Sequence, residues 1–198
     1  MLCTTVTSVA PPKRMSREEY LAFDRASDER WFLWDGEVFA MAGASIDHER
    51  IVANLVANIH GALGRGPCEV LPSNVRTRIP GRDRYVYADA VIVCGEPALE
   101  DERADTLLNP TSLFEVLSDS TERFDRGEKF AGVRAIASLR AYVLVSQITR
   151  RIEVYERGDD AETWTYRAYE GSVRASLDAA VPGLALALED VYQKTAIA

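Results

Sequence analysis

The short apolar run Ser112–Leu117, with one glutamate inside it, constrains the fold of this 198-residue chain more than any other segment. Its length and apolar composition are typical of a buried central strand. Successive side chains of a strand point to opposite faces, so Glu115 shares a face with Leu113 and Leu117. An ionised carboxylate that is buried alone is unstable, and it is normally protonated, paired or bound to a metal. We therefore expect Glu115 to have a specific partner.

A second acid, Asp89, interrupts the otherwise apolar run Tyr85–Val93. Magnesium binds a few hard oxygen ligands and keeps several waters, so two carboxylates on adjacent strands and a carbonyl oxygen suit it. Such an ion binds a phosphate oxygen and lowers the pKa of the attacking water. The alternative is that Asp89 lies at a strand end in a solvated turn.

Lys129 lies in a predicted helix directly after the Glu115 strand. From there its ammonium group can reach back over the strand end, orient a water molecule and stabilise negative charge on a phosphoryl group. The alternative is an ordinary i,i+4 pair with Asp125 on an exposed helix face.

Helix caps, turn pairs and hydrophobic periodicity predict the other elements. Ser16 and Glu19 form a capping box, Asp35-Gly36 favours a hairpin turn, and Asp47 is the expected cap of a second helix. The expected helices are 17–26, one beginning at Asp47, 121–137 and 188–192, and the expected strands lie within 31–41, 68–79, 85–94, 112–117, 141–145, 151–155 and 164–169. This order predicts an α/β fold in which helices flank a mixed β-sheet.

Composition limits the classes of protein to which the chain can belong. We expect a flexible tail over residues 1–14 and one domain over residues 15–198. The net charge of −8 means that nucleic acid would need a local basic patch. The three cysteines are odd in number and lack Cys-x-x-Cys spacing, which disfavours a disulfide framework and a structural zinc site. With no secretion signal or membrane span apparent, a reducing cytoplasm fits best.

Several segments together resemble a known family. They are Trp34–Glu37, Met41–Ser45, Tyr87–Asp89, Phe114–Ser118, Asp125–Phe130, Ser138–Arg140 and Tyr142–Val145. In order and spacing, over roughly Tyr20 to Tyr192, they are similar to the Uma-two (Uma2) family. Its members are described as putative restriction endonucleases of the PD-(D/E)XK nuclease superfamily, so the resemblance implies a restriction-endonuclease-like fold.

The resemblance also implies roles for individual residues. Asp89 and Glu115 would be the two metal-binding acids and Lys129 the superfamily lysine, with Mg or Mn as cofactor. The peptide oxygen of Val116 would be a further metal ligand, and His48 would contact phosphate or a water near the metal; a surface or capping role is the alternative for this histidine.

The sequence departs from the family pattern at two positions. Ala88 replaces the usual proline, a change that alters the stiffness of the backbone but not the carboxylate of Asp89. Phe32 replaces a glutamate found in many relatives, which puts catalysis in question; Glu37, on the neighbouring strand, is a weak substitute.

Arginines could follow a phosphate backbone despite the acidic net charge. Arg76 and Arg126 are the expected substrate-binding members of two groups, and solvated arginines on exposed edges are the alternative. The arginines of the two groups are Arg76, Arg78, Arg82, Arg84, Arg123, Arg126 and Arg134.

The preferred hypothesis is a magnesium-dependent endonuclease that hydrolyses DNA, and the alternative is an inactive module of the same fold that binds DNA or protein. A carboxylate-pair hydrolase acting on sugars would leave Lys129 unexplained. Cutting both strands of a duplex favours a homodimer.

Overall fold

The computed structural model describes residues 14–41, 43–160 and 162–197. Except for Arg14, the expected flexible tail over residues 1–14 lies outside the described residues. Arg14 forms an isolated antiparallel bridge with Glu37. None of the helices within the described ranges combines the length and the apolar character that crossing a membrane requires.

A six-stranded sheet contains most of the core, in the order β11-β10-β9-β8-β6-β3. The central β8 pairs in parallel with β9 and antiparallel with β6. Its central position explains the apolar run around Glu115, because neighbouring strands and packed side chains cover all six of its residues. The strands are β3 (Cys68–Pro72), β6 (Ala90–Cys94), β8 (Ser112–Leu117), β9 (Ala141–Ser146), β10 (Arg151–Arg157) and β11 (Trp164–Glu170).

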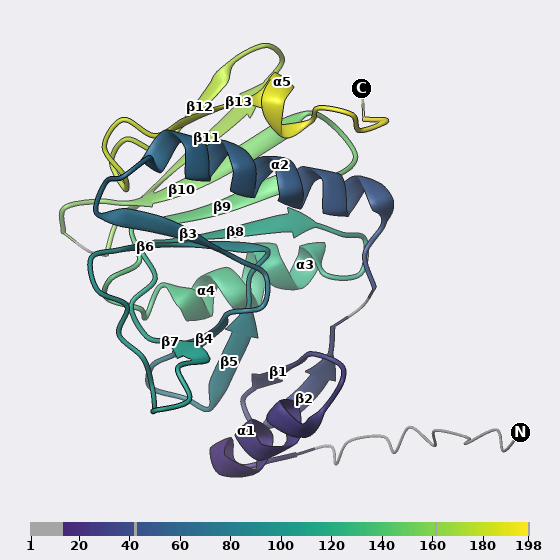
Figure 1. The fold of residues 1–198 in the computed structure, drawn as a ribbon, viewed down its shortest axis with the longest axis vertical. Helices are drawn as coiled ribbons and strands as arrows, with labels where there is room; N and C mark the ends of the chain where they lie inside the picture. Colours follow the sequence, from purple (N-terminus) through teal and green to yellow (C-terminus); the bar gives the residue numbers. More distant parts are fainter. Residues whose placement is uncertain (1–13, 42, 161, 198) are drawn as a thin grey trace, which may run out of the picture.

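A five-stranded sheet lies beside the first, in the order β2-β1-β5-β4-β7. The short β7 pairs in parallel with β4, whereas the other pairs are antiparallel. The helix α1 (Arg17–Ala26) begins with the expected capping box and packs Tyr20 and Leu21 against this sheet. Figure 1 shows α1 beside β1 and β2. The strands are β1 (Trp31–Trp34), β2 (Glu37–Ala40), β4 (Arg76–Ile79), β5 (Arg84–Tyr87) and β7 (Thr106–Leu107).

The two expected strands of one long hairpin are each divided between the sheets. The run over residues 85–94 forms β5 in one sheet and β6 in the other, and the run over residues 68–79 forms β4 and β3 in the same way. The chain therefore changes sheets at Ala88-Asp89, which belong to neither strand. Asp89 thus lies at a strand end, as its alternative interpretation held, although its side chain is only 17% exposed.

Helices cover both faces of the six-stranded sheet (Figure 1). On one face, α2 (Ile46–Leu63) packs Ile51, Leu55 and Ile59 against alternate residues of the central strands. The cap of α2 is Ser45, whose hydroxyl accepts the His48 N–H, so the prediction of Asp47 as the cap was wrong. Asp47 lies inside the first turn.

The opposite face is covered by an unbroken helical run whose hydrogen-bonding pattern changes along its length and which ends at Val133, before the predicted end at residue 137. The predicted helix over residues 121–137 consists of α3 (Glu122–Phe124), a π-helical turn η1 (Asp125–Lys129) and α4 (Phe130–Val133). Single π-helical turns occur often at functional sites. Beyond the sheet, β12 (Arg174–Ser176), β13 (Ala185–Ala187) and α5 (Leu188–Val191) close the core over α2. The sequence showed no sign of β7, β12 or β13, which are two or three residues long.

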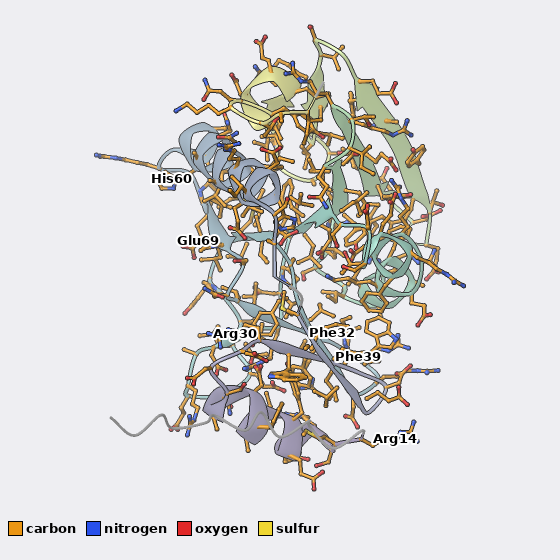
Figure 2. The ribbon with its side chains drawn as sticks, turned by 90° about the vertical axis from the view of Figure 1, so that its right-hand side faces the viewer. Arg14, Arg30, Phe32, Phe39, His60 and Glu69 are labelled. Carbon is orange, nitrogen blue, oxygen red and sulfur yellow. A yellow bond between two sulfur atoms is a disulfide. The ribbon has the colours of Figure 1, made fainter. Side chains whose placement is uncertain are left out.

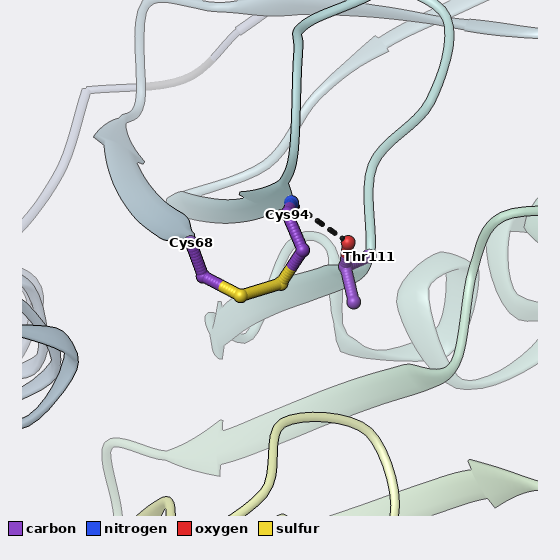
Figure 3. Close-up of a disulfide and its surroundings, with 3 residues drawn as sticks. All are labelled: Cys68, Cys94 and Thr111. Atoms are coloured by element: carbon purple, nitrogen blue, oxygen red, sulfur yellow. Dashed lines mark hydrogen bonds between the residues drawn. A yellow bond between two sulfur atoms is a disulfide. The ribbon is translucent and has the colours of Figure 1, made fainter. Parts of the chain in front are cut away.

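Cys68 and Cys94 form a disulfide, which the odd cysteine count and the spacing had disfavoured (Figure 3). The two residues are direct register partners on β3 and β6, with Cα atoms 3.9 Å apart. Twenty-six positions separate them in the sequence, so no local spacing pattern reveals the pair. The cysteine count therefore no longer supports a reducing compartment. Cys3 lies outside the described residues.

We expect Gly132→Ala to destabilise the fold by about 1–3 kcal/mol, although alanine is the better helix former. A Cβ atom on Gly132 would lie 2.5 Å from the Trp34 ring. That ring is buried beneath the Arg84 guanidinium and packed edge-on against Phe124, so it has little room to move. Urea unfolding of both proteins measures the difference in free energy.

Gly61→Ala is the matched control, because nothing lies within 4 Å of a Cβ atom on this exposed helical glycine. We expect it to stabilise the protein by about 0.4–1 kcal/mol. Equal stabilisation by both substitutions would contradict the packing of Trp34 on α4.

Candidate active site

Three separate elements bring Asp89, Glu115 and Lys129 together. Asp89 lies at the crossing between sheets, Glu115 on the central strand β8 and Lys129 in the π-helical turn η1. All three line one pocket of about 750 Å³. Glu115 shares the face of β8 with Leu113 and Leu117, as strand periodicity predicted, and this face is the one covered by η1 and α4.

Glu115 and Lys129 form a buried ion pair. The Lys129 ammonium lies 2.8 Å from Glu115 Oε2, and the side chains of Lys129 and Glu115 are 7% and 6% exposed. Burial raises the pKa of Glu115 well above its usual range, and the nearby carboxylates of Asp125 and Asp89 raise it further. Lys129 opposes these effects with its positive charge. Glu115 Oε1 has no hydrogen-bond partner among the residues that the structure describes.

Lys129 is held at three points. Besides Glu115, its ammonium lies 3.3 Å from Asp125 Oδ1 and donates a hydrogen bond to the Tyr87 carbonyl oxygen. Burial opposes its charge, but the carboxylates of Glu115 and Asp125 raise the pKa of Lys129 above its usual range. The i,i+4 contact with Asp125 expected on an exposed surface therefore exists, but it is buried and belongs to the site. The sequence signalled this contact without showing its role.

Asp89 is oriented by the backbone and by His48. Its Oδ2 accepts the Val116 N–H at 2.6 Å, and its own N–H donates to the Phe114 carbonyl oxygen. Its Oδ1 lies 3.3 Å from His48 Nε2. Burial lowers the pKa of His48, but the hydrogen bond and charge of Asp89 outweigh it, so the pKa lies above its ordinary value. His48 thus lies in the pocket with the acids.

Arg76, which the sequence suggested as a substrate-binding residue, is not among the described residues that line the pocket. Its guanidinium is only 4% exposed and donates to Asp24 Oδ2, to Asp105 and to Thr106. Asp24 also accepts the Tyr87 hydroxyl. Removing an arginine from this position would leave Asp24 as a buried uncompensated charge, so Arg76 ties α1 to the sheet.

Arg126 is not among the pocket residues either. It donates to Glu153 on β10 and to Glu122 one helical turn earlier. None of the seven arginines of the expected basic surface lines the described part of the pocket. Glu37, the suggested substitute for the missing glutamate at position 32, is also absent from the described lining.

The donor set suits a hard divalent cation. A buried carboxylate oxygen of Glu115 lacks a partner, and Asp89 lies close enough to raise the Glu115 pKa by like-charge repulsion. A cation between the two would relieve both the repulsion and the missing contact. Among residues 14–41, 43–160 and 162–197, no three His, Cys, Asp or Glu side chains are already arranged as metal ligands. A site here therefore relies on two carboxylates and backbone oxygen.

Comparisons with known proteins agree with this architecture. The Uma2 family model, described as "Putative restriction endonuclease", matches residues 17–189. Two uncharacterized proteins of Synechocystis sp. are similar to the chain. The first is 32% identical over 154 residues, which cover 78% of this chain and 87% of the relative. The second is 32% identical over 185 residues, which cover 93% of this chain and 94% of the relative.

Among solved structures, the chain resembles one described as "a putative nuclease belonging to DUF820" from Anabaena variabilis. The TM-score is 0.73 and the identity 12%, with 90% of this chain and 97% of that chain covered. At this identity the likeness concerns the fold. The predicted α/β fold, a restriction-endonuclease-like mixed sheet flanked by helices, is confirmed.

We expect the imidazole of His48 to titrate above pH 6.5 in metal-free protein, and at lower pH in Asp89→Asn, where burial acts without the opposing charge. Because the folded-state pKa is raised, the contact stabilises the fold fully below pH 6.5 and loses this effect as the pH rises through that pKa.

Proton NMR with chelator present measures the His48 titration. Comparison with the spectrum of His60→Gln assigns the His48 signals, because His60, on the exposed surface of α2, is the other histidine of the chain. An unchanged pKa of His48 in Asp89→Asn would rule out the coupling between the charges of His48 and Asp89.

Proposed function

We propose that this chain, which belongs to the Uma2 family, is a metal-dependent endonuclease that hydrolyses phosphodiester bonds of DNA. The observation that carries the proposal is the buried Glu115–Lys129 pair in one pocket with Asp89. A buried ion pair is weak evidence for stability, because burying both charges costs about as much as their attraction returns. Its presence in an open pocket beside two more carboxylates therefore indicates chemistry.

Asp89 and Glu115 would hold the metal, together with the peptide oxygen of Val116. The expected ion is Mg or Mn, since oxygen ligands suit both. When bound, it would supply Lewis-acid polarisation of the phosphate and acidification of a water molecule. The Val116 N–H donates to Asp89 and so fixes the carboxylate beside the strand whose backbone supplies this oxygen.

Lys129 would stabilise the negative charge that develops on the phosphoryl group and orient the attacking water. Its anchors at Asp125 and Tyr87 hold the ammonium in place before substrate arrives, and such preorganised charge is worth most where water is excluded. His48 would keep Asp89 oriented and contribute a titratable proton at the edge of the site.

The second candidate function is a module of the same fold that binds DNA or protein without cutting. Phe32 favours it, because the family resemblance implies a glutamate at this position, whereas a phenylalanine lines the pocket with its ring stacked on Phe39 and Phe124. The homodimer and the cytoplasmic location stay predictions.

We expect calorimetry to show that Mg or Mn binds the protein and releases protons. Because burial raises the pKa of Glu115, protons compete with the metal for this carboxylate more strongly than at an exposed glutamate. Affinity should therefore increase with pH. Glu115→Gln should abolish binding, whereas Glu69→Gln, which alters an exposed glutamate of β3, should not. Equal affinity in the wild type and Glu115→Gln would contradict the assignment.

We expect Asp89→Asn and Lys129→Met each to lose DNA cleavage by at least about 100-fold. The first removes a metal ligand, and the second removes the charge that steadies the reacting phosphate. Cleavage of a labelled single strand, and nicking and linearisation of plasmid, with Mg or Mn measure the loss. Lys194→Met alters an exposed lysine and serves as the matched control.

DNA binding in calcium at fixed salt, together with circular dichroism, separates lost chemistry from lost folding. Lys129→Met should bind within about 1 kcal/mol of the wild type, because one phosphate contact is a small share of the total. If the wild type binds DNA and cuts no substrate, the binding-module function takes the place of the nuclease.

A further inference from the structure

One side of the pocket is an aromatic wall formed by Phe32, Trp34, Phe39 and Phe124. Phe32 and Phe39 are cross-strand partners on β1 and β2, with ring centroids 4.9 Å apart and nearly parallel planes. Phe32 stacks in turn on Phe124, which meets the Trp34 ring edge-on. The rings therefore form a continuous stack that begins in the core and ends at Phe39.

The outer end of this wall is exposed. Phe39 is 41% exposed, and Met41, which also lines the pocket, is 38% exposed. Figure 2 shows Phe32 and Phe39 next to each other on the hairpin, on the side of that hairpin turned toward the body of the protein. Because Phe32 covers one face of the Phe39 ring, the ring is held in orientation while much of its surface remains free.

The rest of the described pocket is acidic. Five carboxylates line it, and Lys129 is the one lysine or arginine among the described lining residues. Asp119 and Glu128 are exposed. Such a pocket repels the closely spaced phosphates of a duplex except where a cation neutralises them. The five carboxylates are those of Asp89, Glu115, Asp119, Asp125 and Glu128.

We propose that Phe39 is a stacking platform for a nucleobase and that the pocket takes a single strand of DNA. This inference rests on the proposed function and names its substrate class. A base next to the reacting phosphate would stack on Phe39 while that phosphate lies at Asp89 and Glu115 across the pocket. Stacking is insensitive to base identity and supplies binding energy without phosphate contacts.

A paired base cannot reach the platform. In a duplex its faces are covered by neighbouring bases, and exposing one requires that the base be unpaired and unstacked. A single strand presents its bases without this cost.

The test is fluorescence anisotropy in calcium with a labelled 20-nucleotide single strand and with the same sequence as a duplex. We expect the wild type to prefer the single strand. Phe39→Ala should weaken single-strand binding about five- to 150-fold, which corresponds to one stacked base. Phe39→Trp should retain single-strand binding because it keeps an aromatic ring, whereas Phe39→Leu, which is apolar but lacks a ring, should lose it as Phe39→Ala does.

A second measurement separates stacking of a base on Phe39 from a purely structural role of this residue. The fluorescence of an oligonucleotide carrying 2-aminopurine should change on binding the wild type, because its emission depends on which groups the base analogue stacks against, and Phe39→Ala should remove this change. Tyr166→Ala, which removes a similarly exposed aromatic ring on β11 outside the pocket, is the matched control. Urea unfolding confirms that each variant is folded.

The outcomes separate this inference from the proposed function. If the wild type cuts DNA and Phe39→Ala binds and cuts single strands equally well, the platform is refuted and the nuclease stands. If the wild type never cuts but shows ring-dependent binding of single strands, the platform stands and the nuclease fails. Equal or tighter binding of duplex, or of a single-stranded RNA of the same sequence, would overturn the assigned substrate class.

Discussion

The burial of the Glu115 carboxylate inside the central strand is the constraint on which the arrangement of the site depends. A lone charge at this depth would be expelled or neutralised, so the surrounding chain must supply a cation. Lys129 meets this requirement from the opposite layer, and its ammonium then needs partners of its own. The Tyr87 carbonyl and Asp125 complete its contacts. One buried acid thus ties together β8, β5 and the helix that covers them.

Two departures from regular secondary structure position these groups. The chain leaves one sheet at Tyr87 and enters the other at Ala90, which places Asp89 at the end of a strand with its carboxylate against the backbone of β8. The π-helical turn places Asp125 and Lys129 together at the same buried point. Irregular backbone is tolerated where packing on both sides compensates for its cost, and such places often carry function.

The pocket combines two environments that suit different parts of one ligand. Its acidic half repels phosphate until a divalent ion is bound, so metal binding and substrate binding are expected to be coupled through charge. Its aromatic half offers a flat apolar surface whose interactions do not depend on that charge. The arginines of the chain are largely engaged elsewhere: Arg76 joins α1 to the sheet, Arg84 pairs with Asp35 and covers Trp34, and Arg126 pairs with Glu153.

Local signals in the sequence determined the first helix with its capping box, the Asp35-Gly36 hairpin, the apolar face of α2 and the identity of β8, because each depends on residues a few positions apart. The glutamate in an apolar strand, together with Asp89 and Lys129, predicted three residues that the structure brings into one pocket, and the resemblance of several segments predicted the family. Only the tertiary structure decided the division of the long hairpin between two sheets, the Cys68–Cys94 disulfide and the burial of Arg76 with Asp24. It alone revealed Asp125 as a site residue and the stacking of Phe39 beside the acids. These features join residues distant in sequence, and their energies come from burial and from partners that no local pattern specifies.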